Sequence, residues 1–168
     1  EAGTLDQLNV TPINRSAFIA AKLIPLWTFA MSDLAIGLVV ARFVFHVPML
    51  GSLLLIFFAA TVYLMGALGI GLWISTVVET QQQAMFVTFS LLMVYLLMSG
   101  LFTPIRGMPA WAQWTAEINP IAHFVALMRA VLLKGAGLRD VSSHLIALGA
   151  ISAAVLTVAV RQYHKRSA

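Results

Sequence analysis

The sequence predicts an all-α protein, a polytopic transmembrane helical bundle with four spans. Composition is the first observation behind this prediction: the 168 residues are 61% hydrophobic and 10% charged, with a mean hydropathy of +0.94. A soluble domain of this size needs far more polar surface to cover its core. Span length is the second, since about 30 Å of hydrocarbon requires ~20 apolar residues of helix. Four segments meet that requirement, and residues 1–168 are treated as one transmembrane domain.

The four predicted spans differ in polarity. The first contains Asp33 and Arg42, whereas the second belongs to Val47–Val78, a run of 32 residues without one charge. A run of this length exceeds one straight crossing and predicts a tilted helix. The later two are uncharged over Ala84–Ile105 and Val141–Val160. We expect the spans at residues 19–45, 50–78, 84–104 and 141–161.

The third link, residues 105–140, is long and contains a 13-residue apolar run, Ile121–Leu133. Thirteen residues are too few to cross a bilayer, so this run predicts a re-entrant or interfacial helix. Gly135 and Gly137 are expected to end that helix.

Two tryptophans in the same link, Trp111 and Trp114, predict a helix that lies in the lipid headgroup zone. Pro109 suits the first turn of a helix, and residues three apart share one helix face. Tryptophan favours the membrane interface, where an apolar ring and a polar N–H are both accommodated. The alternative is a pair of core tryptophans in a loop.

Charge and motifs exclude several function classes. The net charge of +4 does not indicate nucleic acid, because the basic residues are scattered and form no patch. These residues include no cysteine, which excludes a disulfide or a thiolate metal site. The histidines His46, His123, His144 and His164 form no metal-ligand pair at helical spacing. Phosphate-loop, zinc-protease and serine-hydrolase motifs are missing, so nothing recommends a membrane enzyme.

Asp33 is the most informative single residue, because it lies near the middle of the first span. A charge there costs about 2.5–3.5 kcal/mol on insertion scales. Lys22 lies ~16 Å away along the helix axis, and Arg42 lies on the opposite face. Any partner is therefore expected from another helix. Asp33 is either a translocation-path or gating residue, or a packing residue that hydrogen-bonds between helices.

The second span carries small residues at a spacing of four, Ala67, Gly71 and Ser75, with Gly66 and Gly69 nearby. Small residues at this spacing let two helices approach closely. The partner helix is either another span of this chain or a second subunit.

Four spans place both termini on the same side of the membrane. The basic cluster RQYHKR at 161–166 follows the last span directly, which favours a cytoplasmic C-terminus. The count of lysines and arginines alone leaves the orientation open, with five on each side. No secretory leader is expected in the first fifteen residues, which are polar and mixed.

Several motifs occur in a characteristic order. The chain opens with E-A-G-T-L-D-Q-L-N-V-T-P-I at Glu1–Ile13, has a polar turn at Thr76–Ala84 and carries S-G-L-F-T-P at Ser99–Pro104. Met108-Pro109, Asn119-Pro120 and Arg129 follow. Together they resemble the C-terminal half of the membrane permease of type-2 ATP-binding-cassette (ABC) exporters. The resemblance covers essentially the whole chain and makes its helices spans three to six of a six-span permease.

The resemblance implies a division of labour between subunits. A separate ATPase subunit would hydrolyse ATP, so this chain would bind no cofactor and no metal. The partners would be that ATPase, a second permease copy, the lipid bilayer and a periplasmic adaptor. Residues 1–18 would form a cytoplasmic coupling segment and 162–168 a cytoplasmic tail, which resolves the orientation. The implied coupling residues are Glu1, Gly3, Thr4, Leu5, Asp6, Gln7, Leu8, Thr11 and Pro12.

One coupling residue departs from the family pattern: Asp6 stands where glutamate is common, which keeps the carboxylate. Leu5, Leu8 and Val10 are the expected apolar anchors in a groove of the ATPase. The alternative for Glu1–Asn14 is an amphipathic segment that lies on the membrane surface.

The resemblance also implies an extracytoplasmic lid, built from half-helices around Trp111–Glu117 and Ile121–Leu133. Its implied residues are Pro104, Met108, Pro109, Trp111, Trp114, Pro120 and Arg129.

The implied function is that of a permease subunit of an ABC exporter in the bacterial cytoplasmic (inner) membrane. Drug or small-molecule efflux is the commonest case in the family, while lipids and glycan precursors remain open as substrates. The alternative is a non-transporting membrane scaffold or assembly component of the same fold.

Overall fold

The computed structural model describes residues 15–166, and this part of the chain is built from helices without any strand. The predicted all-α class is therefore confirmed. The helices are α2 (Arg15–Phe43), α3 (Leu53–Val77), α4 (Gln81–Leu97), the short 3₁₀ helix η1 (Ile105–Gly107), α5 (Ala110–Ile118), α6 (Pro120–Lys134) and α7 (Ser142–Arg166).

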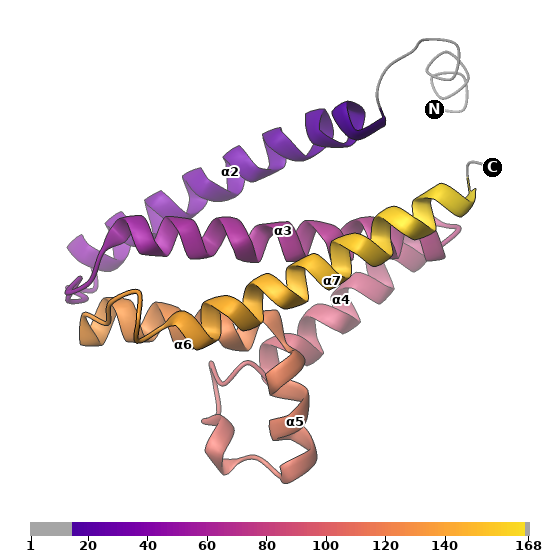
Figure 1. Cartoon of the computed structure of the whole chain (residues 1–168). Helices are drawn as coiled ribbons and strands as arrows, with labels where there is room; N and C mark the ends of the chain where they lie inside the picture. Colours follow the sequence, from indigo (N-terminus) through magenta and orange to yellow (C-terminus); the bar gives the residue numbers. More distant parts are fainter. Residues whose placement is uncertain (1–14, 167–168) are drawn as a thin grey trace.

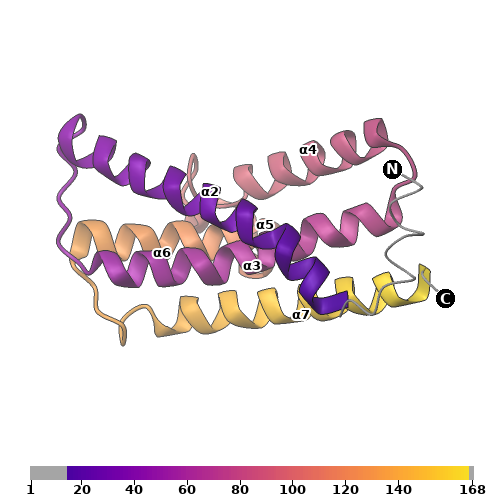
Figure 2. The same cartoon turned by 90° about the horizontal axis from the view of Figure 1, so that it is seen from above.

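Helix α3 lies at the centre of the bundle, with α6 and α7 packed along it and α2 and α4 on its other sides (Figures 1 and 2). The start of α2, the α3–α4 link and the end of α7 lie at one end of the bundle (Figure 1). The α2–α3 and α6–α7 links lie at the other end. Helices α4 and α6 both run from the first end toward the second, and α5 projects sideways between them.

Three helices in the described part are long and apolar enough to cross a membrane, over Leu23–Phe43, Leu53–Val77 and Ser142–Ala159. They match the first, second and fourth predicted spans. Helix α4 is apolar but has only 17 residues. Helices α5 and α6 pass the same test only as a pair, and that pair is bent by 83°. The four-span topology therefore stays a prediction.

Helix α4 begins and ends earlier than the predicted span at residues 84–104. The Thr80 hydroxyl accepts a hydrogen bond from the backbone N–H of Gln83 at 3.2 Å, and the Gln83 side-chain oxygen accepts one from Glu79 N–H at 3.3 Å. This reciprocal arrangement resembles a capping box and starts the helix at Gln81. The helix ends at Leu97, because the chain then turns back on itself.

Close packing of α3 on α7 depends on two glycines. A Cβ added at Gly66 would lie 2.5 Å from the hydroxyl oxygen of Ser152, and one added at Gly69 would lie 3.2 Å from the side chain of Leu156. The Ser152 hydroxyl also donates to the Val62 carbonyl at 2.9 Å, which ties the two helices together. A Cβ added at Gly71 would meet nothing within 4 Å. The small residues that face α7 are therefore Gly66 and Gly69, within this chain.

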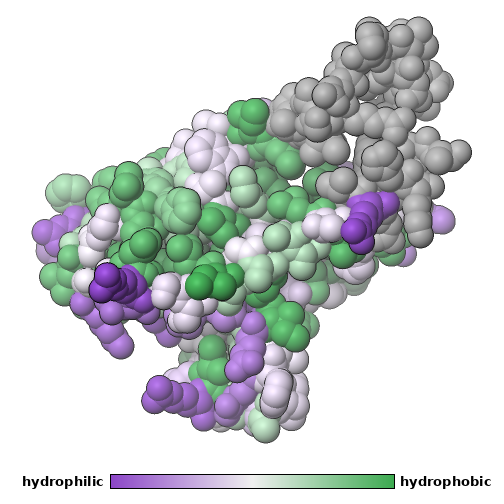
Figure 3. Space-filling view, viewed as in Figure 1, coloured by the Kyte–Doolittle hydropathy of each residue, from purple (hydrophilic) through white to green (hydrophobic). Residues whose placement is uncertain are grey.

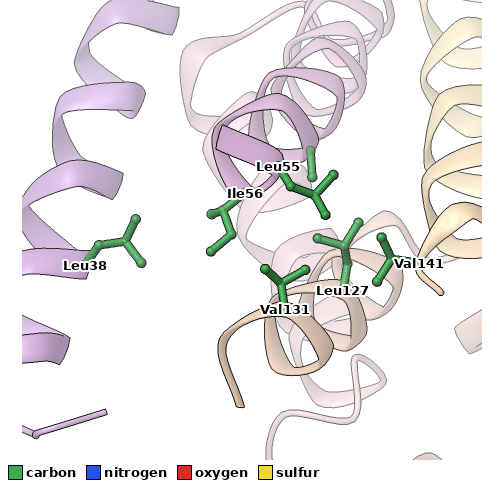
Figure 4. Close-up of a cluster of buried hydrophobic side chains, with 7 residues drawn as sticks. Leu38, Leu55, Ile56, Leu127, Val131 and Val141 are labelled. Atoms are coloured by element: carbon green, nitrogen blue, oxygen red, sulfur yellow. The ribbon is translucent and has the colours of Figure 1, made fainter. Parts of the chain in front are cut away.

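The largest buried cluster joins four elements near the end where the α2–α3 and α6–α7 links lie. Figure 4 shows Ile56 of α3, Leu127 and Val131 of α6, and Val141 beside α7, with Leu38 projecting toward them from α2. Ile56, Leu127, Val131 and Val141 are fully buried. The members of this cluster are Leu38, Leu55, Ile56, Ala59, Leu127, Val131 and Val141.

Candidate functional site

The chain reverses sharply after α4, at Ser99 and Gly100. The buried Ser99 hydroxyl donates to the Leu96 carbonyl at 2.6 Å and accepts from Leu101 N–H at 3.2 Å. Gly100 has a φ of 78°, in the left-handed region that favours glycine. A Cβ there would also lie 2.9 Å from the Ile105 side chain. Local bonds and one glycine therefore fix this turn.

Asn119 ties the end of α4 to the start of α6. Its side chain is 1% exposed. The amide nitrogen donates to the Tyr95 carbonyl at 2.7 Å, and the amide oxygen accepts from Ile121 N–H at 2.9 Å. One side chain therefore caps α6 and also satisfies a carbonyl in the last turn of α4.

Arg129 makes the second tie to the same turn. Its Nη1 donates to the Gly100 carbonyl at 3.0 Å, and its Nη2 donates to the Leu101 carbonyl at 3.2 Å. The planar guanidinium matches two successive carbonyls in a way that a lysine ammonium does not. We call Tyr95, Ser99, Gly100, Leu101, Asn119 and Arg129 the α4–α6 junction.

The predicted end of α6 is confirmed at Gly135. That residue adopts φ 63° and ψ 27°, the left-handed conformation common after helices, and its N–H bonds to the Ala130 carbonyl. At the other end, Pro120 is the first residue of α6, and it is buried.

The tryptophans of α5 share an outward face, as predicted. Trp111 is 64% exposed and Trp114 is 72% exposed, while Ala112 and Ala116 of the same helix are buried. Pro109 differs slightly from the prediction, because it directly precedes the helix. An exposed tryptophan face on a short helix is compatible with the headgroup zone, and that placement stays a prediction.

The two predicted half-helices differ in their surroundings. Helix α6 packs within the bundle, and its Phe124 stacks on Tyr63 of α3 with ring centroids 4.8 Å apart. Helix α5 and η1, which lie next to Pro104, Met108 and Pro109, project from the bundle (Figure 1). The predicted lid stays a prediction: α5 and η1 project from the bundle, whereas Arg129 and Pro120 belong to α6, which packs within it.

Asp33 lies exposed on α2, with no partner for its carboxylate among the described residues. Over Leu23–Phe43 only 6% of the helix is buried within this chain. The neighbouring hydroxyls of Thr28 and Ser32 donate to carbonyls of their own helix, at 2.9 Å each. The side chains that the structure describes thus provide no helix–helix bond for Asp33, and both of its predicted roles stay open.

The structure brings together two histidines that lie 21 positions apart in sequence, too far for their spacing to indicate a contact. His123 of α6 and His144 of α7 face each other, with their Nδ1 atoms 3.1 Å apart. His123 Nε2 lies 2.8 Å from the Glu117 carbonyl, which only accepts, so His123 donates there and its Nδ1 accepts from His144 in the neutral pair. No group of three metal-ligating side chains occurs among the described residues.

Two cavities lie beside α3. One of about 850 Å³ is bounded by α2, α3 and the α6–α7 link, and the other, of about 140 Å³, lies between α3 and α4. Ala67 and Gly71 line the smaller cavity, opposite Thr88 and Tyr95 of α4. Part of the predicted small-residue ladder therefore faces open space beside α4.

The predicted coupling residues, from Glu1 to Pro12, lie outside the described residues. The sequence shows Asn119 only as part of an Asn-Pro motif, and no local pattern indicates its bond to Tyr95. An Asn-Pro pair between two apolar helices is nevertheless a signal for an N-cap.

Comparison with known proteins identifies relatives along the whole chain. The family described as ABC-2 type transporter matches residues 1–133. The Escherichia coli K12 protein named "Probable multidrug ABC transporter permease YbhR" is 34% identical over 166 residues, which are 99% of this chain and 45% of that protein. No solved structure matches the chain.

Two other relatives agree with this similarity. The E. coli K12 protein named "Probable multidrug ABC transporter permease YbhS" is 33% identical over 136 residues, 80% of this chain and 36% of that protein. The Shigella flexneri inner membrane transport permease YhhJ is 30% identical over 167 residues, 98% of this chain and 44% of that protein. The chain therefore spans less than half the length of these curated relatives.

Proposed function

Because the chain belongs to the ABC-2 type transporter family, we propose that it forms part of the membrane pathway of an ABC exporter powered by a separate ATPase subunit. Its helices would be the second half of a six-span permease. The bacterial cytoplasmic membrane is the proposed location, and the chain itself would hydrolyse no ATP.

The α4–α6 junction is the observation that favours transport over a scaffold function. Backbone that leaves regular helix at membrane depth is tolerated only where it is buried in protein or lines a cavity. Here Arg129 satisfies the Gly100 and Leu101 carbonyls of the irregular backbone after α4, and Asn119 satisfies the Tyr95 carbonyl in the last turn of α4. Irregular backbone that is supported in this way fits a chain that lines a pathway.

The proposed partners follow from the exposed surfaces. None of the 17 residues of α4 is buried in the described structure, which leaves this helix available to a second permease copy. The coupling segment, residues 1–18, would contact the ATPase on the cytoplasmic side. Helix α5 would then lie on the extracytoplasmic side, where a periplasmic adaptor would meet it.

The proposed substrate is a drug or another small apolar molecule. Two relatives carry the word multidrug in their names. The walls of the smaller cavity, between α3 and α4, are mostly apolar, which suits such a molecule. Lipids and glycan precursors are the competing substrates.

Transport by the full-length polypeptide together with its ATPase tests the function. We expect ATP-dependent uptake of a fluorescent hydrophobic drug into inside-out vesicles. Uptake should disappear when the phosphate-loop lysine of the ATPase is changed to alanine. A complex that assembles in the membrane but moves no drug, lipid or glycan precursor with ATP would support the scaffold alternative and overturn the proposal.

A further inference from the structure

We propose that the larger cavity, between α2, α3 and the α6–α7 link, holds an acyl chain of an anionic phospholipid. Arg42, Lys134 and Arg139 at its mouth would bind the phosphate of the same lipid. The proposal concerns a structural lipid and does not depend on which molecule the protein transports.

The cavity is large and apolar enough for a hydrocarbon chain. Its volume is about 850 Å³, within the usual range of about 300–1,000 Å³ for small-molecule sites. Trp27 and Met31 of α2 form one wall, and Leu54, Phe57 and Phe58 of α3 form the other. Leu54 is 82% exposed and Phe58 is 54% exposed in the described structure, so their apolar surface is available to a ligand.

Two glycines fix the mouth of the cavity. A Cβ added at Gly51 would lie 2.5 Å from the Val131 carbonyl oxygen, and one added at Gly135 would lie 3.2 Å from Leu50 Cβ. Leu50 N–H also donates to the Leu132 carbonyl at 3.2 Å. The α2–α3 link is thereby attached to the end of α6. This close approach brings the end of α6, with Lys134, and the α6–α7 link, with Arg139, next to the α2–α3 link.

Three cations lie at the same end of the bundle as that opening, next to the segments that line the cavity but not among its lining residues. Lys134 directly precedes the lining residue Gly135, and Arg139 directly follows the lining residue Leu138. Arg42 is in the last turn of α2, and its Nη1 lies 3.4 Å from the carbonyl of Val47 in the α2–α3 link. All three side chains are exposed. Figure 3 shows hydrophilic residues gathered at this end of the molecule, directly beside a hydrophobic surface.

The charge at the mouth is not neutralised by the chain itself. The acidic residue in these two links is Asp140, and its carboxylate accepts a hydrogen bond from Gly137 N–H at 2.9 Å. No ion pair joins it to Arg42, Lys134 or Arg139 within residues 15–166. Three exposed cations beside a single hydrogen-bonded carboxylate leave this end of the bundle basic, and clustered lysine and arginine side chains attract anionic lipid headgroups.

A phospholipid explains both parts of the site, whereas a protein helix explains only one. A further uncharged helix in the cavity would cover the apolar walls but would supply no anion to the three cations. An anionic lipid supplies the apolar chain and the phosphate together. Zwitterionic lipids carry a phosphate too, but their positive headgroup offsets the attraction.

Lipid retention by the full-length protein tests the charged part of the site. The protein would be extracted mildly from membranes that contain phosphatidylglycerol and phosphatidylcholine in equal amounts, and bound lipid measured by native mass spectrometry. We expect phosphatidylglycerol to be retained preferentially. R42Q/K134Q/R139Q should lower that retention at least tenfold, while R106Q/R161Q, which removes exposed cations elsewhere, should not. Equal retention of both lipids, or no loss in the triple variant, would overturn the proposal.

Photocrosslinking tests the apolar part without disturbing the fold. A benzophenone amino acid replacing the exposed Leu54 should crosslink to phospholipid, and T61F, which adds bulk inside the cavity, should reduce that lipid crosslink several-fold. Crosslinking of position 54 to another segment of the same polypeptide or to a second copy would show that protein fills the cavity, and would contradict the lipid assignment.

Discussion

The guanidinium of Arg129 donates to the carbonyls of Gly100 and Leu101, across 29 and 28 residues of sequence. It therefore connects the turn after α4 to the middle of α6. Hydrogen bonds that involve a charged group contribute about 1.5–3 kcal/mol each to stability. This contribution to stability is largest where a carbonyl that lost its hydrogen bond would face hydrocarbon instead of water.

Replacing Arg129 should therefore loosen the turn after α4. We expect R129Q to lower the melting temperature of the detergent-solubilised full-length protein and to reduce ATP-dependent transport at least tenfold. R129K should recover little, because an ammonium cannot bond two successive carbonyls in the fork geometry. The matched control is R106Q, an exposed arginine of the same region. Unchanged transport in R129Q would show that transport does not need the contact between Arg129 and the turn after α4.

The two hydrogen bonds of Asn119 should contribute to the stability of the fold. N119A removes the α6 cap and leaves the Tyr95 carbonyl unpaired, which should cost about 1–3 kcal/mol of stability. Q113A is the comparison, because Gln113 is exposed and bonds to the nearby Met108 carbonyl. Thermal unfolding followed by fluorescence should show a clear decrease for N119A and almost none for Q113A. Equal melting temperatures would contradict the proposed tie.

Substitutions at the glycines of α3 should differ in their effect on stability. G66A should destabilise the packing of α3 on α7, because its Cβ would meet Ser152, whereas G71A should be tolerated. The stability of both variants is measured as the fraction of monodisperse protein on size-exclusion chromatography. S152G should partly rescue G66A by removing the hydroxyl that the new methyl group contacts. A loss in G71A equal to that in G66A would indicate that α7 packs on a different face of α3.

The D33N variant distinguishes a pathway role of Asp33 from a packing role. We expect D33N to lower export while leaving membrane insertion intact, because the side chain lies exposed on α2 and no bond to another described residue is lost. Export is measured in vesicles, and insertion by extraction of the membrane fraction with carbonate. Wild-type export by D33N would favour the packing role.

Helix type, order and approximate bounds could be predicted because hydrophobic length determines them directly. The bounds of α4 could not, because they depend on the side-chain cap at Thr80 and Gln83 and on the turn at Ser99. Glycine chemistry correctly predicted the end of α6 at Gly135.

Contacts between distant segments were beyond the reach of sequence spacing. The family resemblance implies a role for Arg129, but its acceptors, the Gly100 and Leu101 carbonyls, lie 29 and 28 residues away in sequence. The facing of His123 and His144 depends on how α6 packs on α7, a relationship that no local periodicity records. The ladder of small residues was recognised, yet only the packed helices distinguish Gly66 from Gly71.

Cysteine labelling from the two sides of the membrane tests the proposed topology most directly. The 168 residues contain no cysteine, so cysteines introduced at Thr115, which is exposed on α5, and at Ser167 give signals free of background from this part of the chain. In intact cells, a membrane-impermeant maleimide should label T115C, and it should label S167C only after the membrane is permeabilised. Labelling of both positions from the same side would contradict four crossings, and with them the placement of α5 opposite the coupling segment.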